Sequence, residues 1–295
     1  MVRSTSSRFS RWIVRLRLCL GLGIVTSCGG SDAPPRLVFG TTHTVEDSGV
    51  LSMLVREYSA EHGADHRLSV VVAGSGEILA MARRGDVDIV LAHAPDEENA
   101  LVASGRAESR HAVMHNDFVL VGQPSDPAGV GSAITAADAL RRIASAHQPF
   151  VSRGDDSGTH RREKSLWAEA HIIPGWSGYM EAGAGMADAL RIASQRGAYI
   201  LSDRATFEVL RQELQLSVLH EDARALHNQY SVLVMTDARN RDGARQLAEW
   251  LRGTHAQRLI SEYRAPASGR PLFVAEEFRA VQQGAEDYHF DDGES

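Results

Sequence analysis

The sequence predicts an α/β protein built from two lobes. Two observations lead to this prediction: short apolar strands alternate with helical segments in two separate blocks, and two similar strand-like segments lie on either side of the second block. The chain has 295 residues, of which 43% are hydrophobic and 23% charged. This composition is typical of globular proteins, and the length suffices for two ordinary domains.

The first block alternates strands and helices. The expected strands are Leu37–Gly40, Leu68–Val72 and Asp88–Ala92, and the expected helices are Gly49–His62 and Glu77–Arg84. Gly63 and Gly85 directly follow these helices, and glycine at that position commonly ends a helix. The alternation predicts a parallel, doubly wound sheet, whose ligands lie beyond the carboxyl ends of the strands.

The second block has the same character. Its expected helices are Thr135–His147, Thr159–Ala170 and Met186–Arg196, its expected strands are Pro149–Val151 and Ala198–Leu201, and the helices Asp242–Leu251 and His255–Tyr263 follow it. The segment His115–Val121 before the block resembles His227–Val234 after it. Paired strands around an inserted domain are what a two-domain clamp needs as hinge crossovers, and chance similarity of two β-rich segments is the alternative.

Residues 1–27 are expected to be a lipoprotein signal peptide. They carry five arginines and no acidic residue, and the apolar run before Cys28 is too short to span a bilayer as a stable helix. Val25-Thr26-Ser27-Cys28 resembles a bacterial lipobox, which implies acylation of Cys28 and a membrane anchor; an ordinary signal or membrane anchor is the alternative. The glycine- and proline-rich residues 28–36 would be a tether.

The mature chain is acidic. Removing residues 1–27 changes the formal net charge from −7 to −12, which argues against nucleic acid as a partner because nucleic-acid sites need a basic patch. Cys19 leaves with the signal and Cys28 carries lipid, so neither a disulfide nor a cysteine metal site is expected.

Three loops between expected strands and helices combine hydroxyls, glycines and a helix N-terminus. They are Thr41–Gly49, Ala73–Gly76 and Ser152–His160. Unpaired backbone N–H groups and the helix dipole at such positions favour an anion, and Arg153 adds a planar, permanently charged fork. For each loop alone, an ordinary helix cap is the alternative. The coincidence of three such loops, two in one block and one in the other, favours a binding site.

The run Ser-Arg-Gly-Asp-Asp-Ser-Gly-Thr-His at 152–160 resembles the signature of the tungstate-binding proteins of ABC transporters. The similarity continues through 84–95, 116–122, 183–186 and 201–204. It implies a two-lobed, type II periplasmic-binding-protein clamp with two hinge crossovers. Residues 37–116 and 235–295 would form lobe I, and residues 117–234 lobe II. The hinge strands are expected near 116–121 and 229–234.

The resemblance implies an extracytoplasmic binding protein that captures tungstate or molybdate for an ABC permease. The expected ligand-binding residues are Thr41, Thr42, Thr44, Ser75 and Gly76 in lobe I and Ser152, Arg153, Ser157, Gly158 and Thr159 in lobe II. The family's threonine-rich first loop maps onto 41–44, where His43 replaces a threonine. We expect a monomer that needs no cofactor and no free metal ion, since the ligand is itself a metal oxyanion.

The choice among oxyanions depends on their protons. Tungstate, molybdate and sulfate are fully deprotonated near neutral pH and need only donors, whereas phosphate keeps a proton that suits a carboxylate acceptor. Asp155 and Asp156 are the candidate acceptors, and we expect both to face away from the anion, capping the helix or holding Arg153, because a carboxylate repels a bare dianion. Phosphate, sulfate and a sensor role remain alternatives.

Other patterns have plainer explanations. The histidines His93, His115, His160 and His227 lack the spacing and carboxylate partner of a zinc site. Asp156, Ser157 and His160 could suggest a hydrolase triad, but three such residues within five positions do not easily form the relay, and no nucleophile elbow is present. We therefore do not expect an enzyme.

Overall fold

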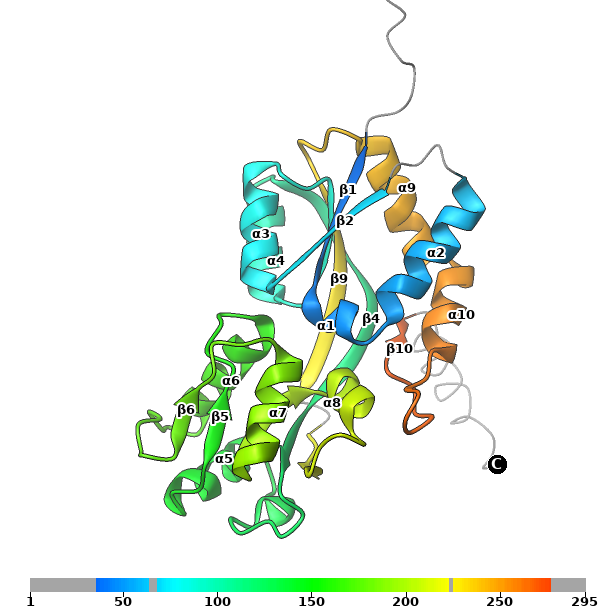
Figure 1. Ribbon diagram of the computed structural model, residues 1–295. Helices are drawn as coiled ribbons and strands as arrows, with labels where there is room; N and C mark the ends of the chain where they lie inside the picture. Colours follow the sequence, from blue (N-terminus) through cyan, green and yellow to red (C-terminus); the bar gives the residue numbers. More distant parts are fainter. Residues whose placement is uncertain (1–35, 64–67, 223–224, 277–295) are drawn as a thin grey trace, which may run out of the picture. The chain divides into compact units, whose positions relative to one another are not determined.

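Two β-sheets joined through one long strand organise the protein (Figure 1). The computed structural model describes residues 36–63, 68–222 and 225–276. The first sheet has the strand order β2-β1-β3-β9-β4, and the second continues the path as β4-β7-β5-β6. The strands β8 and β10 pair with β4 outside this path.

The described elements have the following bounds. The strands are β1 (Leu37–Thr42), β2 (Leu68–Ala73), β3 (Ile89–Ala92), β4 (Ala107–Gly122), β5 (Phe150–Ser152), β6 (Tyr179–Glu181), β7 (Tyr199–Asp203), β8 (Ser217–His220), β9 (His227–Met235) and β10 (Val274–Ala275). The helices are α1 (His43–Asp47), α2 (Val50–His62), α3 (Ser75–Arg84), α4 (Pro95–Ala103), α5 (Ala136–Ser145), α6 (Gly158–Glu169), α7 (Met186–Arg196), α8 (Arg204–Leu210), α9 (Arg241–Arg252) and α10 (Thr254–Glu262), with a 3-10 turn, η1 (Val130–Ser132).

The prediction of parallel strands is confirmed within each block, and the segments that join the blocks pair differently. The strand pairs β1–β2, β1–β3, β5–β6 and β5–β7 are parallel. By contrast, β4 and β9 are antiparallel to each other, β9 is antiparallel to β3, and β4 is antiparallel to β7. The reason is that β4 carries the chain out of the first sheet and β9 carries it back, so the two must run in opposite directions.

Helices cover both faces of each sheet. In the first sheet, α2, α9 and α10 pack on one face through a core that includes Leu54 and Leu247, while α3 and α4 pack on the other through Leu79 and Leu101 (Figure 1). The second sheet has α5 and α6 on one side and α7 and α8 on the other. Both faces are therefore buried, which explains the nearly continuous apolar runs that the strands show in the sequence.

Several expected helix ends are confirmed. Gly85 and Gly197 follow α3 and α7 in the left-handed conformation, with φ of 75° and 59°, which glycine adopts without steric cost. The side chain of Thr135 accepts a hydrogen bond from the backbone N–H of Asp138 and caps α5.

Two predicted loop boundaries were wrong, and both lie at the carboxyl end of the first sheet. Residues 41–49 were expected to be a loop, but β1 continues through Thr42 and the short helix α1 follows it. The β-branched threonines extend the strand, since such side chains fit a pleated surface. Similarly, α3 begins at Ser75 rather than Glu77, so that the serine lies in the first turn of the helix.

The two segments that connect the sheets are paired with each other. In β4 and β9, Asn116 lies opposite Asn228 and Asp117 lies opposite His227. Beyond this point β4 continues into the second sheet, where Phe118 pairs with Asp203. The expected second hinge segment, 229–234, lies inside the first sheet, where residues 231–234 pair with β3.

Within the described part of the chain, no helix is both long and apolar enough to cross a membrane. The expected signal peptide (1–27), the acylated Cys28 and most of the tether (28–36) lie outside the described residues.

The packing of the second sheet predicts a large effect of truncating Leu140, a fully buried residue of α5 that packs in the core of this sheet. Leu140→Ala should lower the free energy of unfolding by about 2–5 kcal/mol, because it removes buried methyl groups and leaves a cavity. Ile134→Ala is the control, since Ile134 is 88% exposed and its truncation should change stability by less than about 0.5 kcal/mol. Denaturant unfolding of both variants tests this, and similar losses for the two would contradict the assigned core.

Candidate oxyanion site

A small cavity lies where residues from the carboxyl ends of β1, β2, β3 and β5 meet. Its volume is about 10 Å³, which is the space that one water molecule fills. The lining residues are Thr42, His43, Thr44, Gly74, Ser75, His93, Arg153 and Ser157. The cavity is far smaller than the pockets that hold drug-sized organic ligands, which favours a compact solute.

Lobe I contributes mainly hydroxyls to this cavity. Thr42 is the last residue of β1, Thr44 lies in α1, and Ser75 opens α3 directly after Gly74. All three side chains are at most 2% exposed. The local sequence places them here because each follows the end of a parallel strand, where a helix N-terminus faces the same edge of the sheet.

Lobe II contributes a guanidinium and a hydroxyl from the loop between β5 and α6. Arg153 is 2% exposed, and its Nη2 donates to Oδ2 of Asp155. The other carboxylate oxygen of Asp155 accepts a hydrogen bond from the backbone N–H of Ser157 at 3.2 Å. Asp155 thus holds Arg153, as expected, and both of its oxygens are engaged within the loop.

Three buried donors at the cavity are unpaired. Among the described residues, none forms a hydrogen bond with Thr42 Oγ1, Ser75 Oγ or Arg153 Nε. A buried polar group without a partner costs about 1–3 kcal/mol, so such groups call for an explanation. A guanidinium N–H can only donate, and hydroxyls can donate as well as accept. The set therefore suits an acceptor-rich guest, namely an anion.

The 152–160 loop is held in a specific conformation. Gly154 has a φ of 66° and Asp156 a φ of 56°. The side chain of Ser157 accepts a hydrogen bond from the backbone N–H of His160 at 3.3 Å and caps α6. Asp156 pairs with Arg161 at 2.7 Å, and Arg161 also pairs with Glu97 of α4. The carboxylate of Asp156 is thereby bound outside the cavity, on a contact between the two lobes.

The structure brings together only part of the predicted binding set. Thr42, Thr44, Ser75, Arg153 and Ser157 line the cavity. Five other candidates lie near it but not in its wall: Thr41, Gly76, Ser152, Gly158 and Thr159.

These five residues have different surroundings. The hydroxyl of Thr41 donates to the carbonyl of Leu91 at 3.0 Å and thereby ties β1 to β3. Ser152 lies near the buried carboxyl of Glu163, whose pKa burial raises to about 7 while the neighbouring Ser152 hydroxyl opposes this rise. Gly76 and Gly158 each border a different, larger pocket. Thr159 is fully buried, and none of the described residues pairs with its hydroxyl.

Sequence reasoning missed His93, which lines the cavity from the residue after β3. Its ring Nδ1 lies 2.9 Å from Oδ1 of Asn228 on β9. Burial lowers the pKa of His93 to about 4, an effect that the Asn228 hydrogen bond opposes and the charge of Arg153 reinforces. The position directly after a buried strand was the available signal, but isolated histidines are too common in protein cores for that signal to decide.

His43 also lines the cavity, at its more exposed side. Its side chain is 44% exposed, and Nδ1 lies 3.7 Å from the carboxylate of Glu46 in the next turn of α1. The residue that replaces a threonine of the family pattern therefore lies at the rim and faces both the cavity and solvent.

The hydrolase alternative lacks the necessary contacts. Ser157 Oγ interacts with the backbone N–H of His160 rather than with the imidazole, and His160 Nδ1 accepts from the backbone N–H of Asp156 at 3.0 Å. No serine–histidine–aspartate relay is formed by these three side chains. Over residues 36–63, 68–222 and 225–276, no group of three or more histidine, cysteine, aspartate or glutamate side chains is arranged to hold a metal ion.

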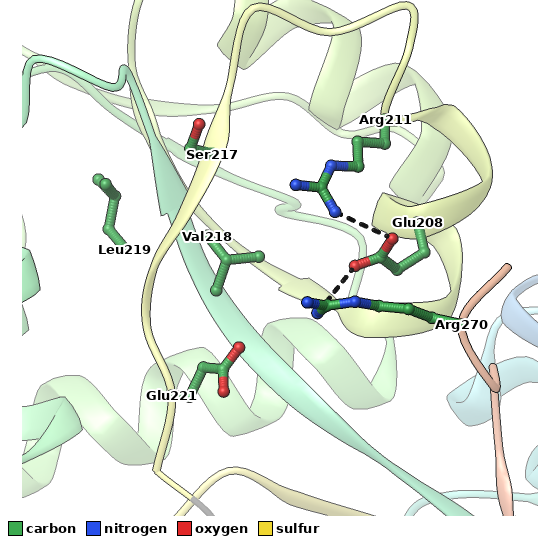
Figure 2. A pocket seen from close by; sticks show the side chains of 7 residues that line it. All are labelled: Glu208, Arg211, Ser217, Val218, Leu219, Glu221 and Arg270. Atoms are coloured by element: carbon green, nitrogen blue, oxygen red, sulfur yellow. Dashed lines mark ion pairs between the residues drawn. The ribbon is translucent and has the colours of Figure 1, made fainter. Parts of the chain in front are cut away.

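A larger pocket elsewhere in the protein also contains arginines, but their surroundings differ from those of Arg153. This pocket of about 320 Å³ is bordered by Glu208, Arg211 and Arg270 (Figure 2). The fully buried carboxylate of Glu208 lies between the two arginines, 3.5 Å from Arg211 Nη1 and 3.7 Å from Arg270 Nη1. The two arginines face the one carboxylate of Glu208, whereas the guanidinium of Arg153 lies beside the unpaired hydroxyls of Thr42 and Ser75.

Comparison with known proteins identifies the family. Residues 29–253 match the family described as the PBP superfamily domain. The chain belongs to the PBP superfamily. It is also 36% identical over 250 residues to the tungstate-binding protein TupA of Peptoclostridium acidaminophilum, covering 83% of this chain and 87% of that protein. This similarity places the chain in the family that includes TupA.

Two solved structures of the same family resemble this chain over most of its length. The crystal structure of the tungstate ABC transporter from Geobacter sulfurreducens is 36% identical, with a TM-score of 0.70 over 77% of this chain and 98% of that one. The tungstate binding protein TupA from Desulfovibrio alaskensis G20 is 33% identical, with a TM-score of 0.69 over 82% of this chain and 99% of that one. The fold is therefore the two-lobed α/β fold of periplasmic binding proteins, as the sequence predicted.

The conformation of the loop predicts that a side chain at Gly154 destabilises the protein. A Cβ at this residue would lie 2.8 Å from Cβ of Glu181, and the φ of 66° disfavours any L side chain. Gly154→Ala should lower the free energy of unfolding by about 1–3 kcal/mol. Gly175→Ala is the matched control, because a Cβ there meets no atom within 4 Å among the described residues. Equal stability of the two variants in denaturant unfolding would contradict the loop geometry.

Proposed function

We propose that this protein is an extracytoplasmic solute-binding protein that captures a tetrahedral oxyanion, tungstate or molybdate, for an ABC importer. The main support is a set of three buried donors without partners, which come from both lobes and lie on Thr42, Ser75 and Arg153. The names of the family members, which refer to tungstate binding, support the choice of anion.

The proposed ligand shell combines hydroxyl, backbone and guanidinium donors. Thr42, Thr44 and Ser75 act from lobe I, while Arg153 and Ser157 act from lobe II. Thr41, Ser152 and Thr159 are buried in the segments that carry these residues but do not line the cavity. A bound dianion would satisfy the unpaired donors and gain strength from the water-excluded surroundings, where charge-assisted hydrogen bonds are strongest.

Binding on this proposal requires the lobes to move. A tetrahedral oxyanion is larger than the single water molecule that the cavity fits, so the lobes must separate to admit it and close again around it. We assign the hinge to the two paired crossovers, at Asn116–Asp117 of β4 and His227–Asn228 of β9. These are the positions at which the chain passes between residues 37–116 and 235–295 on one side and residues 117–234 on the other.

The surroundings of the aspartates favour a fully deprotonated anion over phosphate. Both oxygens of Asp155 are occupied by Arg153 and the Ser157 backbone, and Asp156 is paired with Arg161. No carboxylate belongs to the described wall of the cavity, so no carboxylate acceptor is available there for the proton of hydrogen phosphate. Sulfate or phosphate binding and a sensor role of the same clamp remain the alternatives that competition experiments address.

Calorimetry of the mature domain with tungstate, molybdate, sulfate and phosphate tests the proposed site. Arg153→Ala should weaken tungstate binding by about 2–5 kcal/mol, because it removes a buried charge-assisted donor. Arg211→Ala is the matched control, since this arginine is half-exposed and lines the separate pocket of Figure 2.

Two outcomes would contradict the site. One is the absence of binding for all four oxyanions, and the other is an unchanged affinity in Arg153→Ala. Phosphate that displaces tungstate at similar concentration would instead reverse the proposed order of ligands.

We further propose that the mature protein is a monomeric lipoprotein anchored through Cys28, so that it stays near the permease. Two or more acyl chains hold a protein stably at a membrane, whereas the unacylated chain has no such anchor. In a bacterial host, the wild type should partition into the detergent phase and carry an acyl mass. Cys28→Ser should partition into the aqueous phase, and detergent partitioning equal to that of the wild type would exclude this mode of anchoring.

A further inference from the structure

His93 lies where the cavity, lobe II and the hinge strands meet. Its buried ring borders the cavity and stacks on Tyr230 of β9, with ring centroids 4.7 Å apart. A Cβ on Gly158 would lie 2.8 Å from Cε1 of the ring, so the start of α6 is packed directly against it. Among the charged groups of the described residues, it is Arg153, which also lines the cavity, that lowers the pKa of the ring.

The hydrogen bonds around Asn228 fix the tautomer of His93. The side-chain nitrogen of Asn228 donates to Oδ1 of Asn116 at 2.7 Å and to the hydroxyl of Tyr230 at 3.1 Å. Its oxygen therefore faces the ring, and an amide oxygen can only accept. Nδ1 of His93 must then carry the hydrogen, which leaves Nε2 of the neutral ring with a lone pair. None of the described residues donates a hydrogen bond to Nε2.

A lone pair is the wrong partner for a bare dianion. All other side chains that line the cavity can present donors, and an acceptor beside the anion would repel it. Protonation of Nε2 turns this acceptor into a donor and adds a positive charge, while Nδ1 keeps its hydrogen bond to Asn228. The imidazolium form has donors at both nitrogens, so it fits Asn228 and an anion simultaneously.

We propose that His93 takes up one proton from solvent at Nε2 when the anion binds, and that the imidazolium then donates to the anion. The inference rests on the proposed function. Without anion, burial holds the pKa of His93 at about 4, so the ring is neutral near pH 7. A neighbouring dianion raises that pKa, because opposite charge favours the protonated form.

The sign of the pH dependence follows from this linkage. The protonated form predominates in the complex and the neutral form in the free protein, so binding takes up protons at pH values between the two pKa values. Affinity should therefore rise as pH falls through the pKa of the bound state. Phosphate offers a contrast, since it carries a proton that it can donate to Nε2 without uptake from solvent.

Other titratable groups near the cavity must be separated from His93. On α1, His43 lines the cavity and Asp47 has a pKa raised by burial. At the end of β7, burial raises the pKa of Asp203 to about 6, and the charge of Arg153 opposes this rise. Asp155 pairs with Arg153 in the loop after β5. Substitution of His43, Asp47 and Asp203 separates the contributions of these groups from that of His93.

His93 also lines a pocket of about 500 Å³ that further charged residues border. They are Asp96, Glu97, Arg110, Arg161, Arg162 and His227. Arg161 is paired with Glu97, Arg110 with Glu98 and Arg162 with Glu169. Each of these arginines is paired with a carboxylate, as Arg153 is with Asp155, and among them Arg153 is the one whose charge lowers the pKa of His93.

The test is calorimetry of tungstate binding at pH 7 in buffers with different ionisation enthalpies, which gives the number of protons exchanged per anion. The wild type should take up about half a proton or more. His43→Gln, Asp47→Asn and Asp203→Asn should retain this uptake, whereas His93→Gln should reduce it to near zero. Tungstate binding without proton uptake, or unchanged uptake in His93→Gln, would overturn the inference and leave the proposed function intact.

Nitrogen NMR of the wild-type protein with labelled histidine rings supplies a measurement that needs no substitution at His93. One ring whose Nδ1 is protonated in the free protein should gain a proton at Nε2 when tungstate is added. Saturation with tungstate and no change at any buried histidine ring would contradict the proposal. If the wild type binds no oxyanion at all, the proposed function fails and this inference fails with it.

Discussion

Burial of hydrogen-bond donors that the protein itself does not pair is the constraint on which the site depends. Folding brings Thr42 and Ser75 of one lobe and Arg153 of the other out of water at one point. Each unpaired group opposes folding, so the closed arrangement carries a cost that an anion can remove. On the proposed function, ligand affinity and lobe closure depend on the same few atoms, since a ligand shifts such an equilibrium by as much as it prefers the closed state.

The supporting structure is arranged to keep these donors available. Asp155 aligns Arg153 without occupying its Nε, and Ser157 caps α6 by accepting rather than donating. Asp156 is held away by Arg161. Acidic groups are therefore close enough to orient the loop and yet not directed at the anion, which allows a protein of net charge −7 to offer a donor-rich cavity.

Much of this organisation could be predicted from the sequence, because it depends on local patterns. The apolar runs predicted the parallel strands, and the glycines at 85 and 197 predicted two helix ends. The hydroxyl-rich loops predicted five of the residues that line the cavity. The direction of β4 and β9, however, depends on contacts between distant segments. The direction of the Thr41 hydroxyl, which donates to Leu91, depends on where β1 ends. The hydrogen bond of His93 depends on Asn228, which lies 135 residues away in the sequence.

The sharing of β4 between the sheets has a consequence for how the chain acquires its structure during synthesis or export. Residues 117–222 already contain β5, β6, β7 and β8 together with helices for both faces of the second sheet, so this lobe can assemble as soon as it emerges. The first sheet cannot, because β9 lies between β3 and β4 and is contributed by residues 227–235. The lobe whose first strands are synthesised earliest is therefore completed last. Until β9 is added, the edge of β3 has no strand paired with it.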